Sequence, residues 1–199
     1  MLFLKGAVMA AFMMLGVFQE PSVVSLTVLT YNIHHGSGMD TVLDLDRIAS
    51  IIREQTPDVV GLQEVDRGLP RTRKMDMPAL LAEKLGMTCV FESNYNFDGG
   101  EYGNATLTKW PVISSRNIAL PNPLSQEPRG CLVVQIEWEG TKLDVFNTHL
   151  GLNGQERLAQ AEAIVTALGE NPVILAGDMN ENVRSEERRV GKECRSRVA

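Results

Sequence analysis

Four apolar runs of the chain end in polar side chains that could do chemistry. The last run ends in Asp178 and Asn180, two residues apart, so that both side chains leave a strand on one face. The other three runs end in Asn32, Glu64 and His149. Each residue alone is explained by a turn, a solvated strand end or a structural histidine. Together they could hold a hard cation, orient a water and donate hydrogen bonds to phosphoryl oxygens, so they predict a metal-assisted phosphoryl transfer site at one sheet edge.

Strands and helices that would position these residues follow from the hydrophobic pattern. Runs apolar on both faces, such as 59–62 and 173–176, indicate a layered sheet that is covered on both sides. Helices are predicted at 44–56, 77–85 and 154–168, the last with Leu158, Ala161 and Val165 facing inward. Strands are predicted at 23–32, 58–64, 88–92, 104–109, 112–118, 130–138, 142–149 and 173–178, with a hairpin across 139–141.

Five local sequences carry a resemblance to a known family. TYNIHHG, LQEVDRG, GGEYGNATL, FNTHLGL and LAGDMNE resemble, in order and composition, the motifs of the endonuclease/exonuclease/phosphatase superfamily with the DNase I-like fold. The resemblance covers nearly all of residues 24–183. It implies an α/β fold, the DNase I-like four-layered α/β sandwich, here incomplete at the C-terminus, with the site at one edge of two packed sheets.

The resemblance also implies roles for single residues. Glu64 corresponds to the acidic ligand of Mg²⁺, with Mn²⁺ as the alternative ion, and Asn32 to the amide that organises metal and phosphate. Asp178 corresponds to the carboxylate that orients or deprotonates water, Asn180 to a transition-state donor and His149 to a phosphate contact. Residues expected on the substrate side are Tyr102, Asn104 and Arg129, and further candidates are His34, His35 and Asp66.

Composition limits the class of protein and of partner. The chain has 199 residues, is 44% hydrophobic and 22% charged, and fits one globular domain. Its formal net charge is −6, which disfavours a long polyanion such as duplex nucleic acid as ligand. A small or lipid-linked phosphate ester is therefore the expected substrate, and no protein partner is predicted. Cys89 and Cys131 lie in predicted strands, and their spacing leaves a disulfide between them open.

Both ends of the chain differ from its middle. Lys5 precedes an apolar run at 6–18, so residues 1–20 are predicted to be a signal peptide or an uncleaved N-terminal anchor, and the protein to be exported. Residues 184–199 carry six basic and three acidic side chains, against 13 and 22 in the preceding 183. Residues 184–197 resemble the translated read-through of a sequencing-library adapter, so we expect a non-native tail after a partial domain at 24–183.

Three functions follow from these observations. The favoured one is a Mg²⁺-dependent phosphoesterase that uses metal-activated water. The alternatives are a secreted endonuclease acting on DNA or RNA and a non-catalytic fragment or binding module. Family members carry a further Asp and a terminal Asp-His pair after the Asp-x-Asn strand, and this sequence has no histidine after His149. We therefore expect this chain to be inactive or nearly so.

Overall fold

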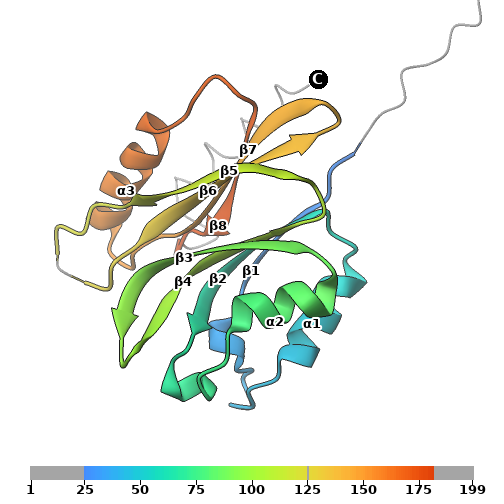
Figure 1. Ribbon diagram of the computed structural model, residues 1–199. Helices are drawn as coiled ribbons and strands as arrows, with labels where there is room; N and C mark the ends of the chain where they lie inside the picture. Colours follow the sequence, from blue (N-terminus) through green and yellow to red (C-terminus); the bar gives the residue numbers. More distant parts are fainter. Residues whose placement is uncertain (1–24, 125, 182–199) are drawn as a thin grey trace, which may run out of the picture.

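Two four-stranded sheets pack face to face, with helices on both outer faces (Figure 1). The computed structural model describes residues 25–124 and 126–181. Helices α1 and α2 cover one sheet and α3 lies against the other, which gives the four-layered α/β sandwich predicted from the sequence. The predicted signal or anchor at 1–20 and the predicted tail at 184–199 lie outside the described residues. Within the described ranges, no helix is long and apolar enough to cross a membrane.

The first sheet has the strand order β1-β2-β4-β3. Its strands are β1 Val28–Asn32, β2 Val59–Arg67, β3 Thr88–Phe97 and β4 Gly100–Thr108. β1 and β2 are parallel, whereas β2, β4 and β3 pair antiparallel. β3 and β4 are longer than predicted and meet at a tight turn of Asp98 and Gly99, both with positive φ.

Local sequence signals explain the two helices on this sheet. α1, Leu45–Glu54, begins after Asp44, whose side chain accepts a hydrogen bond from the Arg47 N–H. α2, Met77–Leu85, begins after Asp76, which caps the Ala79 N–H, and ends at Gly86 in the left-handed conformation. Both helices bury an apolar face against the sheet, in a core cluster that includes Ile48, Ile52, Met77, Leu81, Leu62 and Leu107.

The second sheet has the order β5-β6-β7-β8. Its strands are β5 Val112–Ala119, β6 Gly130–Trp138, β7 Thr141–His149 and β8 Val173–Asp178. β6 and β7 form the predicted hairpin, and β7 and β8 pair in parallel so that His149 lies opposite Asp178. A Cβ at residue 177 would collide with the Thr148 carbonyl, so Gly177 permits this close pairing.

The predicted inward face of the third helix is wrong. α3, Gly154–Thr166, buries Glu156, Gln160 and Ile164, while Leu158 and Val165 are 61% and 64% exposed. The buried polar side chains are tolerated because they are hydrogen-bonded: Gln160 accepts from the Gly151 N–H and donates to Glu156 and to the Pro121 carbonyl. The helix packs on the sheet through Ile164, Ala163 and Ala167, and its buried polar side chains are satisfied, so Leu158 and Val165 face outward.

A polar seam joins the two sheets beneath the strand ends. Asn147 on β7 is fully buried and donates through Nδ2 to the Leu62 and Ala105 carbonyls, at 3.1 and 2.8 Å. Its Oδ1 accepts from Gln63 Nε2 at 2.7 Å. Because these bonds connect β7 to β2 and β4, they fix how the strand ends of one sheet lie against those of the other.

Candidate active site

The strand ends predicted to carry chemistry meet at one edge of the two sheets. Asn32 ends β1, His149 ends β7 and Asp178 ends β8. Asn32 Nδ2 donates to Asp178 Oδ2 at 3.0 Å, which is a direct contact between the two sheets. The structure thus brings together Asn32, Glu64, His149, Asp178 and Asn180 around a cavity of about 350 Å³.

A β-bulge directs Glu64 into this cavity. The pairing of β2 with β4 shifts register between Leu62 and Val65, and Glu64 has a φ of 58°. A bulge adds a residue to one strand and re-aims the side chain that it carries. Glu64 therefore leaves the regular alternation of its strand, and its Oε1 accepts a hydrogen bond from Asn32 Nδ2 at 2.8 Å.

Two carboxylates share the amide of Asn32. Nδ2 donates to both Glu64 and Asp178, while Oδ1 accepts from the His34 N–H at 3.0 Å. In this arrangement the amide oxygen faces the backbone, so Asn32 orients the carboxylates and its oxygen does not face the space between them. Burial raises the pKa of Asp178, but hydrogen bonds from Asn32 and from the Asn180 N–H outweigh it, so the pKa lies below its usual value.

Hydrogen-bond donors face the carboxylates from the other side of the cavity. Arg129 Nη1 lies 3.0 Å from His149 Nδ1, and because a guanidinium can only donate, Nδ1 accepts and the proton resides on Nε2. Asn180 Nδ2 lies 3.0 Å from that Nε2, and Asp178 Oδ2 lies 3.8 Å from it. Burial and then the Arg129 charge lower the pKa of His149, which keeps the imidazole neutral. Asn180 Nδ2 also donates to the Leu150 carbonyl at 2.7 Å, so His149 Nε2–H and the second N–H of Asn180 lie side by side at the cavity.

Residues 29–198 match the "Endonuclease/Exonuclease/phosphatase family". The chain belongs to this family. It is 28% identical over 174 residues to the uncharacterized protein YbhP of Escherichia coli K12, covering 79% of this chain and 67% of YbhP. It is 28% identical over 165 residues to tyrosyl-DNA phosphodiesterase 2 of Danio rerio, covering 78% and 41% of the two chains. The predicted resemblance is confirmed.

A solved structure shows the same fold. The endonuclease/exonuclease/phosphatase of Beutenbergia cavernae DSM 12333 superposes with a TM-score of 0.67 at 28% identity, over 78% of this chain and 47% of that one. The chain thus spans less than half of the Danio rerio and Beutenbergia proteins. Enzymes of the endonuclease/exonuclease/phosphatase family hydrolyse phosphate esters and generally use a divalent metal such as Mg²⁺.

The donor set of this family member fits a hard cation. Glu64 and Asp178 supply carboxylate oxygens, which are the ligands that Mg²⁺ prefers, and Asn32 holds one oxygen of each within hydrogen-bond distance of a single nitrogen. The side chain of Asp178 is one-third exposed, so water can complete an octahedral shell.

Arg71 lies on the substrate side of the cavity, although the sequence analysis did not single it out. Asp66 is completely buried and holds the guanidinium of Arg71 through two hydrogen bonds of 2.8 and 2.7 Å. Arg71 lines the cavity and lies 5.3 Å from the ring centroids of both Phe97 and Tyr102. An arginine five positions after an aspartate does not predict an ion pair from the sequence. The two side chains meet only because the chain turns between them. The candidate Asp66 therefore lies behind the cavity wall and positions Arg71.

The remaining candidates divide into residues that line the cavity and one that does not. Tyr102 and Arg129 line it, and burial raises the pKa of the Tyr102 hydroxyl. Asn104 is not among the residues that line the cavity: it is only 2% exposed and donates to the Gly130 carbonyl at 3.0 Å, between the sheets. It follows Tyr102 by two residues on the same face of β4, but that face dips into the sandwich, so Asn104 belongs to the fold. His34 and His35 line the cavity from the loop after β1.

Proposed function

We propose that this site hydrolyses phosphate esters with a divalent cation, Mg²⁺ or alternatively Mn²⁺. Glu64 and Asp178 would hold the ion, and Asn32 would keep the two carboxylates at the spacing that ion binding needs. When bound, the cation would polarise the phosphoryl group and lower the pKa of a coordinated water. The observation that carries the proposal is the pair of carboxylates joined by one amide, with the His149 imidazole 3.8 Å from the Asp178 carboxylate.

The protein residues would act on water and on the phosphoryl oxygens. Asp178, with its lowered pKa, is ionised at neutral pH and can accept a hydrogen bond from the attacking water and orient it. His149 Nε2–H and Asn180 Nδ2–H would donate to one phosphoryl oxygen, and their fixed position stabilises charge that develops there. Arg129 would hold the imidazole in the required tautomer through Nδ1.

The substrate that we propose is a small or lipid-linked phosphate ester, met outside the cytoplasm. The cavity wall of Arg71, Tyr95, Phe97 and Tyr102 combines a cation with aromatic faces, which suits an anionic group attached to an apolar or ring-bearing moiety. A secreted endonuclease is the second candidate, and the Danio rerio relative supports it because its name describes a phosphodiesterase acting on tyrosyl-DNA.

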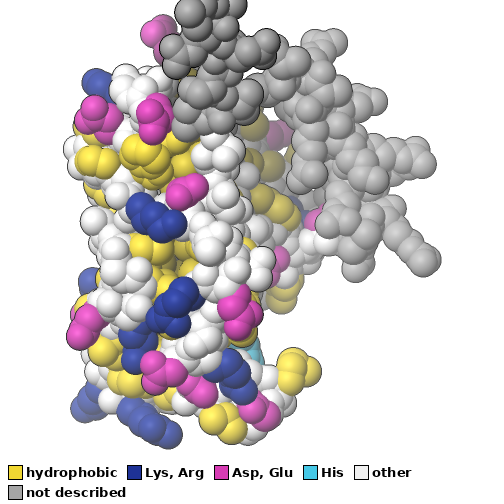
Figure 2. Space-filling model, turned by 90° about the vertical axis from the view of Figure 1, so that its right-hand side faces the viewer, with side chains coloured by type: hydrophobic (Ala, Val, Ile, Leu, Met, Phe, Trp, Pro, Cys, Tyr) yellow, Lys and Arg dark blue, Asp and Glu magenta, His cyan; other side chains and the backbone are white. Residues whose placement is uncertain are grey.

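The acidic net charge of −6 supports the first candidate over the second. On the face in Figure 2, Lys and Arg side chains are interspersed with Asp and Glu across the described residues. A nuclease that follows a phosphate backbone would benefit from a continuous basic track. The described residues of this face carry mixed charge, and the acidic net charge of the chain as a whole disfavours such a track.

Hydrolysis assays with matched variants test the proposal. We would assay the chain, and a longer protein that continues the predicted partial domain past residue 183, with Mg²⁺ against bis-p-nitrophenyl phosphate, p-nitrophenyl phosphate, sphingomyelin and plasmid DNA. The control variants are Glu64→Ala and Asp178→Asn, with Asn96→Ala as an exposed-site control. Metal-dependent hydrolysis by the longer protein that both site variants abolish supports the function, and the substrate identifies the class. Hydrolysis unchanged by Glu64→Ala refutes it.

We also propose that the 199-residue chain itself has little activity. Three histidines stand in the sequence, and none follows His149, so the family's terminal Asp-His pair has no counterpart here. Mg²⁺-dependent turnover by this chain at the rate of the longer protein would contradict this part of the proposal.

A further inference from the structure

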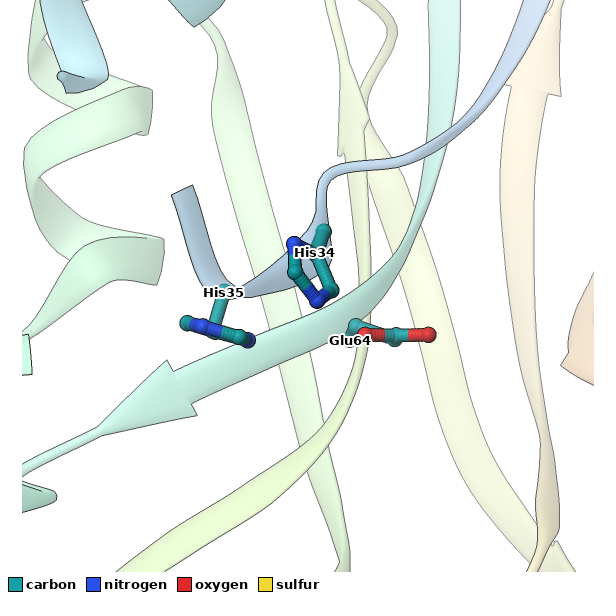
Figure 3. Close-up of side chains that lie close together, drawn as sticks. All are labelled: His34, His35 and Glu64. Carbon is teal, nitrogen blue, oxygen red and sulfur yellow. The ribbon is translucent and has the colours of Figure 1, made fainter. Parts of the chain in front are cut away.

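Two adjacent histidines stand beside Glu64 and have no part in the proposed reaction. Both come from the loop after β1, whereas Glu64 comes from β2 (Figure 3). One ligand atom from each of His34, His35 and Glu64 lies within 4.8 Å of the other two. The three side chains line the same cavity as the carboxylates but offer two nitrogens and one oxygen, which is a different ligand set.

The surroundings of His34 free one ring nitrogen for a ligand. Its Nδ1 lies 3.3 Å from the Ser37 carbonyl, and a carbonyl oxygen can only accept, so Nδ1 carries the proton. The lone pair of the neutral ring then resides on Nε2. Metal-bound histidines commonly donate their other N–H to a backbone carbonyl, which fixes the tautomer and the ring orientation.

The backbone brings the second histidine to the same side. His34 and His35 both have positive φ, 46° and 43°, and the turn that they form is closed by a hydrogen bond from the Ser37 N–H to the His34 carbonyl. The two rings lie 4.3 Å apart between centroids and are tilted by 52°. Consecutive residues of an extended strand would point to opposite faces, so this turn is what makes the two imidazoles neighbours.

We propose that His34, His35 and Glu64 form a second cation position, selective for a borderline divalent ion of the Zn²⁺ class. Imidazole nitrogens favour such ions, whereas Mg²⁺ takes oxygen ligands. Ligand atoms of a tetrahedral zinc site lie about 3.4 Å apart, so side-chain rotations must close the present spacing, within 4.8 Å, by at most about 1.4 Å. His34 is exposed and His35 half-buried, which leaves room for such rotations.

Neighbouring charges permit a cation at this position. Arg71 also lines the cavity, but its charge is balanced by the fully buried Asp66, with which it shares two hydrogen bonds. Glu64 therefore contributes a net negative charge to the corner. Its Oε1 accepts a hydrogen bond from Asn32 at the proposed magnesium position, and the same carboxylate lies near the two histidines. One carboxylate can therefore serve both positions.

Calorimetric titration of the full chain with ZnCl₂ tests the proposal. We would use a Cys194→Ser background, because that thiol is a competing zinc ligand, and compare it with the variant His34→Gln/His35→Gln. Loss of one outer-shell partner costs about 10–100-fold in metal affinity, so loss of both imidazole ligands should weaken zinc binding by at least about 100-fold. Folding is checked by circular dichroism. If the double variant does not fold, each single variant should weaken zinc binding by at least about tenfold.

Magnesium supplies the internal control. The rise in unfolding temperature caused by Mg²⁺ should be the same with and without the two histidines, and Glu64→Gln should weaken the binding of both ions. Equal zinc affinity in the parent and the histidine variants, or no zinc binding to the parent at micromolar concentration, would overturn the inference. Zinc binding needs no turnover, so it can succeed where the proposed hydrolysis fails, and the reverse also holds.

Discussion

Replacement of Asn147 by alanine should destabilise the chain by about 3–5 kcal/mol, because this side chain is the centre of the polar seam between the sheets. The variant leaves the Leu62 and Ala105 carbonyls without the donor that now lies 3.1 and 2.8 Å away. Each buried polar group left unsatisfied costs about 1–3 kcal/mol. Gln63 loses its 2.7 Å partner but keeps contacts of 3.2 Å with Thr30 Oγ1 and the Gly61 carbonyl, so its contribution is smaller.

This loss is large against the total stability of about 5–15 kcal/mol that is usual for a domain. Urea unfolding followed by tryptophan fluorescence would measure it, and Asn96→Ala on the exposed end of β3 is the matched control, expected to change stability by less than about 0.5 kcal/mol. A change below about 1 kcal/mol at Asn147 would show that the carbonyls find other partners. The reasoning that the seam holds the sheets in register would then fail.

Three further predictions concern single groups. Asn32→Asp should destabilise the cation-free chain by about 1–2 kcal/mol, since it replaces a donor to Asp178 by a third carboxylate. Mg²⁺ should then raise the unfolding temperature of the variant by more than it raises that of the parent. An equal rise would argue against a cation there. The lowered pKa of His149, caused by burial, means that stability is full above pH 6.5 and falls as pH drops below it, and His149→Asn should flatten this dependence of the urea midpoint. Burial raises the pKa of Cys89 and Cys131 to about 12, so iodoacetamide at pH 8 should label them only after unfolding, as mass spectrometry would detect.

Elements with local signals could be predicted from the sequence. The helix predicted at 77–85 coincides with α2, whose ends are marked in the sequence by Asp76 and Gly86. The hairpin of β3 and β4 was missed between 92 and 104, although Asp98-Gly99 is a strong signal for a two-residue turn. The residues around that turn are polar, and the predicted strands follow apolar runs, so these parts of β3 and β4 were not predicted.

Burial of polar residues could not be predicted in the same way. The apolar positions of α3 suggested an inward stripe, but the helix faces the sheet with Glu156 and Gln160. Gln160 is satisfied by the Gly151 N–H just before the helix, by the distant Pro121 carbonyl and by Glu156 one turn away. Asn104 and Asn147 follow the same rule. In each case the sequence shows a polar residue, and only the tertiary structure shows the buried group that it satisfies.

Contact between Asn32 and Asp178 lies equally beyond local sequence reasoning, since 146 positions separate them. Motif order predicted that the strand ends would meet, but the backbone that aims them is irregular. Glu64 and Asn180 both have positive φ, 58° and 49°, as do the two histidines of the loop after β1. Left-handed backbone at residues other than glycine costs on the order of 1 kcal/mol or more each and persists only where the surrounding structure enforces it. The bulge in β2 enforces it at Glu64, and the hydrogen bond from the Asn180 N–H to Asp178 Oδ1 enforces it at Asn180. Four of the ten non-glycine residues with positive φ in the described chain line this one cavity, so part of the strain lies where polar side chains must leave the regular strands, which is the pattern expected of a site whose geometry has been favoured over local stability.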